Sequence, residues 1–156
     1  MKTLQMLLGC SERRTAAIIE ATVLDVCFNR AAVKTTKVLR LSEFTRWASC
    51  GGAELIILVA NHLLPDPRLG EVTEEQLVQS IWLAKNRSSA PLVIMGAPSH
   101  YQHRFTEAGA DATVTSMLNV DELRAELDRV LDLPAPEEEF EPQPRWSLTS
   151  LFGLGK

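Results

Sequence analysis

Two short, unbroken apolar runs constrain the fold of this chain most strongly. One run extends from Leu55 to Ala60 and the other from Leu92 to Met95. Neither run alternates between apolar and polar residues, so each predicts a strand that is buried on both faces of a sheet. Sheets of that kind are parallel, and helices connect their strands and cover both faces.

The segments around these two runs predict a regular alternation of strands and helices. Further strands are expected within 4–8, 33–39 and 112–115, and helices within 14–28, 42–47, 74–84, 99–109 and 119–131. Ser11 is a candidate cap for the first helix, and Thr73 with Gln76 is a candidate capping box. Five strand–helix units predict a doubly wound α/β fold, with a flavodoxin-like parallel sheet of strand order 2-1-3-4-5.

Composition excludes several classes of protein. The net charge of −4 argues against a nucleic-acid-binding domain, which usually carries a basic surface. No apolar run approaches the roughly 18 residues that a membrane span requires, and no signal peptide is recognised. Three cysteines without a CxxC pair are typical of free thiols in a reducing compartment. We therefore expect a cytoplasmic protein that does not bind membranes.

The composition changes sharply after residue 133. Residues 134–144 are acidic and rich in proline, which is typical of a linker, and residues 145–156 become apolar again. We predict a domain over 1–133, a linker over 134–144 and a hydrophobic tail over 145–156. The tail offers Trp146, Leu148, Leu151 and Phe152 for contacts. The sequence leaves open whether these residues dock on their own domain, remain disordered or bind a partner.

Three segments carry a resemblance to a known family. They are Glu54–Leu58 followed by Pro65, then Pro91–Met95, and then the Gly109-Ala110-Asp111 turn. Together these segments resemble the response-regulator receiver (CheY-like) superfamily of bacterial two-component signal transduction, over about residues 4–132. The resemblance implies the same five-stranded fold and a site at the carboxyl ends of the strands.

The residues that perform receiver chemistry are replaced at the matching positions. Val59 stands where the resemblance places the phosphate-accepting Asp, and Gly9-Cys10 stands where it places the magnesium-binding acidic pair. Gly96 occupies the position of the Thr or Ser that senses the phosphoryl group, and Ser116 that of the Lys that pairs with it. Thr113 occupies the position of the aromatic residue that switches its rotamer. The chain therefore resembles a degenerate pseudo-receiver, for which we expect no enzyme activity, no metal and no cofactor.

Two functions are compatible with the sequence. The first is a phosphorylation-independent signalling or scaffolding module that binds protein partners, or a second copy of itself, through the fourth helix, fifth strand and fifth helix. The alternative is a small-ligand-binding protein or thiol-dependent enzyme that uses strand-end residues, namely Cys10, Ser11, Asn61 and His62. The chain has no Walker, GxGxxG or GxSxG motif. The absence of a paired acid, base or nucleophile favours the first function.

Overall fold

The computed structural model describes residues 2–65, 70–115 and 119–133. Its elements alternate along the chain as β1 (Lys2–Gly9), α1 (Arg13–Val26), β2 (Ala31–Val38), α2 (Leu41–Ser49), β3 (Leu55–Val59), α3 (Glu74–Arg87), β4 (Leu92–Met95), α4 (Gln102–Ala108), β5 (Ala112–Val114) and α5 (Val120–Val130). The five strands are all parallel and lie in the order β2-β1-β3-β4-β5. This topology confirms the predicted flavodoxin/CheY-like fold.

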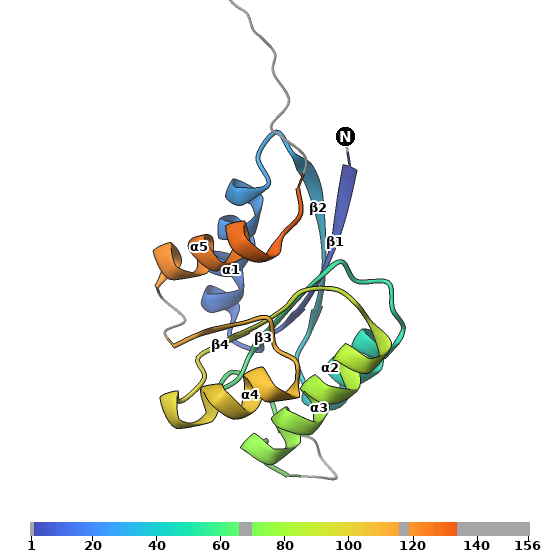
Figure 1. The fold of residues 1–156 in the computed structure, drawn as a ribbon, viewed down its shortest axis with the longest axis vertical. Helices are drawn as coiled ribbons and strands as arrows, with labels where there is room; N and C mark the ends of the chain where they lie inside the picture. Colours follow the sequence, from blue (N-terminus) through green and yellow to red (C-terminus); the bar gives the residue numbers. More distant parts are fainter. Residues whose placement is uncertain (1, 66–69, 116–118, 134–156) are drawn as a thin grey trace, which may run out of the picture.

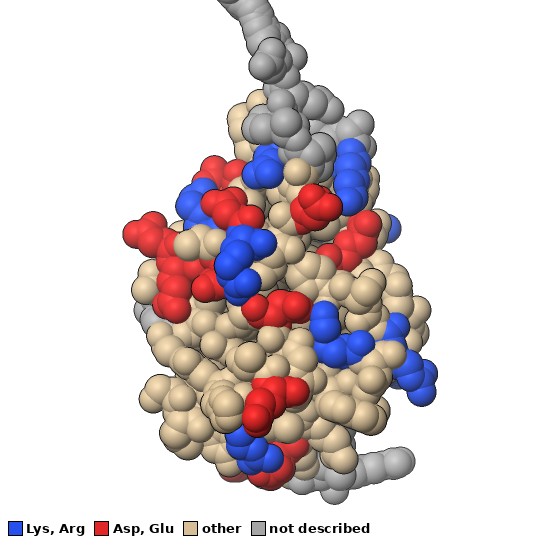
Figure 2. All heavy atoms as spheres, viewed as in Figure 1, with Lys and Arg blue, Asp and Glu red and all other residues tan. Residues whose placement is uncertain are grey.

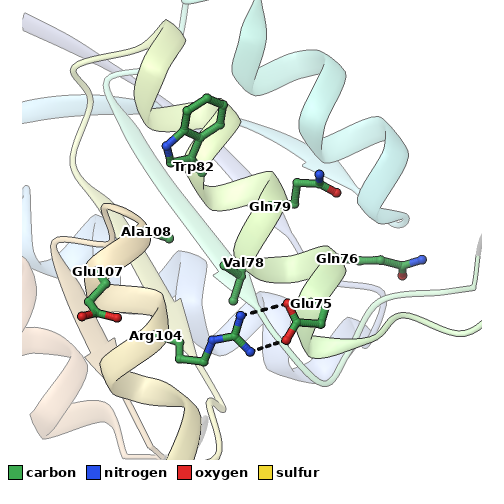
Figure 3. Close-up of a pocket in the computed structure, with 8 residues that line it drawn as sticks. All are labelled: Glu75, Gln76, Val78, Gln79, Trp82, Arg104, Glu107 and Ala108. Carbon is green, nitrogen blue, oxygen red and sulfur yellow. Dashed lines mark hydrogen bonds and ion pairs between the residues drawn. The ribbon is translucent and has the colours of Figure 1, made fainter.

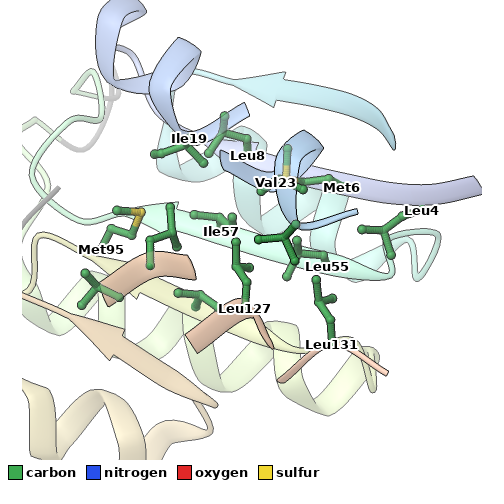
Figure 4. Packing of buried hydrophobic residues seen from close by; sticks show 14 of the residues in the cluster. Leu4, Met6, Leu8, Ile19, Val23, Leu55, Ile57, Met95, Leu127 and Leu131 are labelled. Carbon is green, nitrogen blue, oxygen red and sulfur yellow. The ribbon is translucent and has the colours of Figure 1, made fainter. Parts of the chain in front are cut away.

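Helices cover the two faces of the sheet unequally. Helices α1 and α5 lie on one face, and α2, α3 and α4 lie on the other (Figure 1). Successive side chains of β3 point to opposite faces, so Ile57 joins the cluster under α1 and α5 while Leu58 joins the cluster under the other helices. Figure 4 shows the first of these clusters, in which Ile57 packs among Leu8, Ile19 and Leu127.

One of the two predicted helix caps is present. The Thr73 hydroxyl accepts a hydrogen bond from the Gln76 N–H, and the Gln76 side chain accepts one from the Thr73 N–H, so the capping box is confirmed. The prediction for α1 was wrong by one residue. Glu12 caps this helix in place of Ser11, because its carboxylate is long enough to accept hydrogen bonds from the N–H groups of Arg14 and Thr15.

The Gly109-Ala110-Asp111 turn has a structural function. The Asp111 carboxylate accepts hydrogen bonds from the Leu92 N–H at 2.8 Å and from the Lys85 ammonium at 2.9 Å. The Asp111 carbonyl accepts another from Arg129 at 2.7 Å. This one residue therefore ties the start of β4 to α3 and α5.

Several predicted features lie outside the described residues. They are Ser116, the linker 134–144 and the tail 145–156 with its four contact residues. No helix within the described ranges is long and apolar enough to cross a membrane.

The contacts of Asp111 predict a measurable contribution to stability. Asp111→Ala removes the acceptor of a partly buried N–H and of an ammonium, and we expect it to lower the free energy of unfolding by about 2 kcal/mol. Asp128→Ala, at an exposed position of α5, is the matched control and should change it by less than about 0.5 kcal/mol. Urea unfolding followed by circular dichroism measures both. Equal effects of the two substitutions would contradict the assigned role of Asp111.

Candidate functional site

The carboxyl ends of the strands form the edge of the sheet where doubly wound proteins place their sites. The Ser11 N–H donates to the His62 carbonyl at 2.6 Å, and the Ala60 N–H donates to the Met95 carbonyl at 2.8 Å. These bonds join the segments that follow β1, β3 and β4. The structure therefore brings Gly9, Cys10, Val59 and Gly96 to one edge, whereas Thr113 lies half-buried in the middle of β5.

Val59 is the last residue of β3, and its side chain is fully buried. It belongs to the same apolar cluster as Cys10, Met95 and Val114. A nucleophilic carboxylate must reach its phosphoryl donor, and a side chain enclosed by this cluster meets no solvent. The position that the resemblance gives to the phosphate acceptor is thus part of the core.

The space beside Gly9 is also filled by apolar atoms. A Cβ atom at this position would lie 2.9 Å from Cδ1 of Leu58 and 3.2 Å from Cδ1 of Phe44. Such contacts are too close for a larger side chain without movement of its neighbours. A metal-binding carboxylate at residue 9 would therefore enter the cluster under α2 rather than a cleft.

The backbone at Gly96 differs from that of an ordinary strand end. Its φ angle is +72°, in the region that glycine adopts readily and that β-branched residues avoid. Its N–H donates to the Val114 carbonyl at 2.8 Å, which fixes the peptide against β5. A threonine would be strained at this φ angle, so the backbone conformation after β4 favours glycine.

Glu12 is the carboxylate nearest in sequence to the end of β1, and its oxygens already accept hydrogen bonds. Oε1 accepts from both the N–H and the hydroxyl of Thr15, each at 2.6 Å, and Oε2 accepts from the Arg14 N–H. These bonds lower the pKa of the Glu12 carboxyl, with the Thr15 hydroxyl as the largest cause. Within the described ranges, no group of three or more His, Cys, Asp and Glu side chains could hold a metal ion.

The residues of the thiol or ligand-binding alternative do not form one site. The Cys10 side chain is only 2% exposed, and burial raises the pKa of its thiol, so it stays protonated. Asn61 lines an open hollow of about 310 Å³ together with Leu63, Pro65 and Glu71, among others, and neither Cys10 nor Ser11 lines it. His62 is half-buried and its carbonyl accepts from Ser11, and its side chain is near enough to Glu12 to be a minor cause of the lowered pKa of that carboxyl.

A groove between α3 and α4 was not predicted from the sequence. It has a volume of about 650 Å³, and Val78, Trp82 and Ala108 line it together with the ion pair of Arg104 and Glu75 (Figure 3). Arg104 lowers the pKa of the Glu75 carboxyl and lies 5.5 Å from the ring centre of Tyr101. Trp82 is 56% exposed. The sequence did contain one signal for this groove. Trp82 directly follows Ile81, which belongs to the buried stripe of α3, so the helix turns the large indole away from the core.

This groove has the chemistry of a contact surface. It offers an exposed indole, an aliphatic floor and charged groups at its rim, a mixture that is common where proteins bind proteins. Its lining as described contains no Ser, Cys or Thr side chain that could act as a nucleophile.

No protein-family model and no curated protein matches this chain. Solved structures do match its fold. One match is the receiver domain of a sensor histidine kinase from Pseudomonas aeruginosa PAO1, with a magnesium ion in its active-site cleft. It is 15% identical to this chain, and the match covers 82% of this chain and 97% of that one, with a TM-score of 0.58. A response regulator receiver domain from Rhodospirillum rubrum is 17% identical over 86% of this chain and 100% of that one, with a TM-score of 0.57.

Pilus assembly proteins share the fold as well. The CpaE protein from Caulobacter crescentus is 14% identical over 82% of this chain and 99% of that one, with a TM-score of 0.61. The structural neighbours are therefore receiver domains and receiver-like domains, and at these identities the likeness concerns the fold alone.

The burial of Val59 predicts the outcome of restoring the acidic residue. Val59→Asp places a carboxylate in an apolar cluster, and we expect it to lower the free energy of unfolding at pH 7 by at least about 3 kcal/mol. The matched control Val59→Ala loses only packing and should cost about 1–2 kcal/mol.

The pH dependence of Val59→Asp has a definite sign. Burial raises the pKa of the new carboxyl above its unfolded value of about 3.9, so the folded state binds its proton more tightly than the unfolded state does. Stability of this variant relative to Val59→Ala should therefore increase as the pH falls from 7 towards 4. Urea unfolding at several pH values measures it. A cost below about 1 kcal/mol at pH 7 would indicate an open, solvated cleft and would refute the burial argument.

The protected thiol of Cys10 predicts low reactivity. In the native protein at pH 8, we expect iodoacetamide to alkylate Cys10 at least about tenfold more slowly than in the urea-unfolded chain, because reaction requires local opening. Peptide mass spectrometry measures the rate for each cysteine. The pKa of the Cys10 thiol is higher in the folded state than in the unfolded chain, so the unfolded thiol loses its proton first as the pH rises. The free energy of unfolding should therefore decrease as the pH rises above about 9. Equal native and unfolded rates would support a reactive thiol.

Proposed function

We propose that this chain is a non-catalytic receiver-like module that acts through protein–protein contacts, independently of aspartyl phosphorylation. The observation that carries the proposal is the complete burial of Val59 at the end of β3. The glycine-shaped backbone at Gly96 and the filled space beside Gly9 support it, because both oppose a simple return of the missing residues. In this proposal Thr113 and Ser116 are also positions where receiver chemistry has been lost.

The surface favours a protein partner over a nucleic acid. On the face shown in Figure 2, acidic and basic side chains are interspersed, with no continuous basic stripe. The net charge of the whole chain is −4, which would repel a phosphate backbone. The α3–α4 groove and the edge formed by α4, β5 and α5 are the candidate contact surfaces, and pairing of two copies is one use of that edge.

The names of the structural neighbours are compatible with this function. They include response regulators and pilus assembly proteins, so the same fold serves in signalling proteins and in proteins of a surface assembly. We propose a place in such a regulatory complex in the cytoplasm, with residues 1–133 as the folded module. The thiol-dependent alternative has no observation in its favour, because Cys10 is buried and protonated.

Phosphorylation chemistry provides the direct test. The full chain is incubated with acetyl phosphate and magnesium beside an active receiver domain as the positive control, and intact masses are measured. We expect the control to gain one phosphoryl group and this chain to gain none, because Val59 offers no nucleophilic atom. A mass gain that hydroxylamine removes would reveal an acyl phosphate and would overturn the proposal.

A further inference from the structure

The α2 face of the sheet is covered over only part of its length. Helix α2 has nine residues, which gives it a length of about 14 Å. Strand β2 has eight residues and therefore extends about 26 Å. Because α2 begins at the carboxyl end of β2, it ends before it reaches the amino ends of β1 and β2. Figure 1 shows these two strand ends extending beyond α2.

Strand register identifies the residues that are left uncovered. Leu7 and Val38 belong to the cluster under α2, so every second residue from them points to the same face. On this face the paired residues are Gly9 with Val38, Leu7 with Thr36, Gln5 with Lys34, and Thr3 with Ala32. Exposure increases along this series, from buried at Gly9 and Val38 to exposed at Thr3 and Ala32.

The opposite face of the same strands is better covered near their amino ends. There Leu4 and Met6 are each 2% exposed and Ala31 is 7% exposed. Further along β2 this face is half-buried at Val33 and Thr35 and exposed at Lys37, so the contrast between the two faces lies at the amino ends. We call the five exposed or half-exposed residues of the α2 face the β1–β2 ledge, and they are Thr3, Gln5, Ala32, Lys34 and Thr36.

An apolar groove lies where the ledge meets the end of α2. It has a volume of about 200 Å³, sized for one or two side chains rather than for a drug-sized ligand. We call it the α2-end groove, and its lining residues are Gln5, Met6, Leu7, Thr36, Trp47, Cys50, Gly52 and Ala53. None of them carries a carboxylate, ammonium or guanidinium group. Trp47 is 47% exposed, so a large indole surface here lacks cover from the described chain.

The described chain ends at the amino ends of the strands, with Leu133 packed against the cluster of the opposite face. Leu133 lines a hollow together with Lys2, Leu4 and Glu54, which are direct neighbours of ledge or groove residues in the sequence. Figure 1 shows the chain after α5 running towards the amino ends of β1 and β2. Residues 134–144 can span up to about 36 Å when extended, which exceeds the length of β2. Residue 145 can therefore reach any part of the ledge.

The composition of the following segment matches the surface. Residues 145–154 contain Trp146, Leu148, Leu151, Phe152 and Leu154, which suit a groove without charged groups. The linker carries Glu137, Glu138, Glu139 and Glu141. Lys34 on the ledge is exposed and forms no ion pair with the described residues, so it can interact with these carboxylates. The α3–α4 groove is a poorer match, because Glu75 and Glu107 line it.

We propose that residues 145–154 pack on the β1–β2 ledge of their own chain, with an apolar side chain in the α2-end groove. The sequence left docking on the domain and binding to a partner both open for Trp146, Leu148, Leu151 and Phe152. The structure favours docking, because the apolar α2-end groove and the exposed indole of Trp47 lie within reach of the linker. A partner that binds this face must then displace residues 145–154, so these residues compete with the partner for the β1–β2 ledge.

Cys50 provides the readout, because it is an exposed thiol that lines the groove. The experiment uses the full chain and measures the rate of Cys50 alkylation by iodoacetamide. Leu151→Asp combined with Phe152→Asp should release the segment and raise this rate by about tenfold, as removal of a local protecting contact does. Ala135→Asp combined with Gln143→Asp adds the same charge in the linker, outside the docking segment, and should leave the rate within about twofold of the wild type.

Two further measurements distinguish docking of residues 145–154 within one chain from binding of a second copy. Slow alkylation of Cys10 and Cys27 in every variant verifies that the domain stays folded. Ser150→Cys should form a disulfide with Cys50 at a rate that does not depend on protein concentration, because the two thiols belong to one chain. An unchanged Cys50 rate in the Leu151/Phe152 variant would overturn the proposal. So would a protection or a disulfide that disappears on dilution, since that result would assign the ledge to a second copy.

Discussion

The burial of β3 on both faces is the constraint on which the rest of the structure depends. All five residues from Leu55 to Val59 are fully buried. A strand of this kind has no face left for water, so helices must cover the sheet on both sides and the neighbouring strands must supply every backbone hydrogen bond. The parallel order β2-β1-β3-β4-β5 meets both requirements, with α1 and α5 on one side and α2, α3 and α4 on the other.

The same packing fills the edge of the sheet where this fold usually places its site. In this chain the two apolar clusters continue to the carboxyl ends of the strands, where Val59, Met95 and Ala97 are buried. The space that acidic side chains would need beside Gly9 is occupied by Leu58 and Phe44. Close packing of this kind makes the edge a contributor to stability, and the proposed function rests on it.

The sequence predicted those parts of the structure that follow from periodicity and local hydrogen bonding. The uninterrupted runs at 55–59 and 92–95 predicted β3 and β4, and Thr73 with Gln76 predicted the start of α3. The start of α1 was misplaced because Ser11 and Glu12 can both cap a helix, and only the three-dimensional path of the loop selects between them. The positive φ angle of Gly96 and the α3–α4 groove depend on contacts between distant segments, which a one-dimensional pattern does not contain.

The length of α2 has consequences beyond the ledge that it leaves bare. Helix α2 packs on α3, where the Thr45 hydroxyl donates a hydrogen bond to the buried Ser80 hydroxyl at 3.0 Å. One end of α2 borders the α2-end groove through Trp47, and its neighbour α3 borders the α3–α4 groove through Trp82. Trp47 and Trp82, the exposed tryptophans among the described residues, thus belong to two packed helices on the same face of the sheet. The proposed contact edge of α4, β5 and α5 extends to the opposite face of the sheet, because α5 packs there through Leu123 and Leu127. The α3–α4 groove and the α5 part of that edge therefore depend on different helix layers, and a substitution on one of them can be tested without disturbing the other.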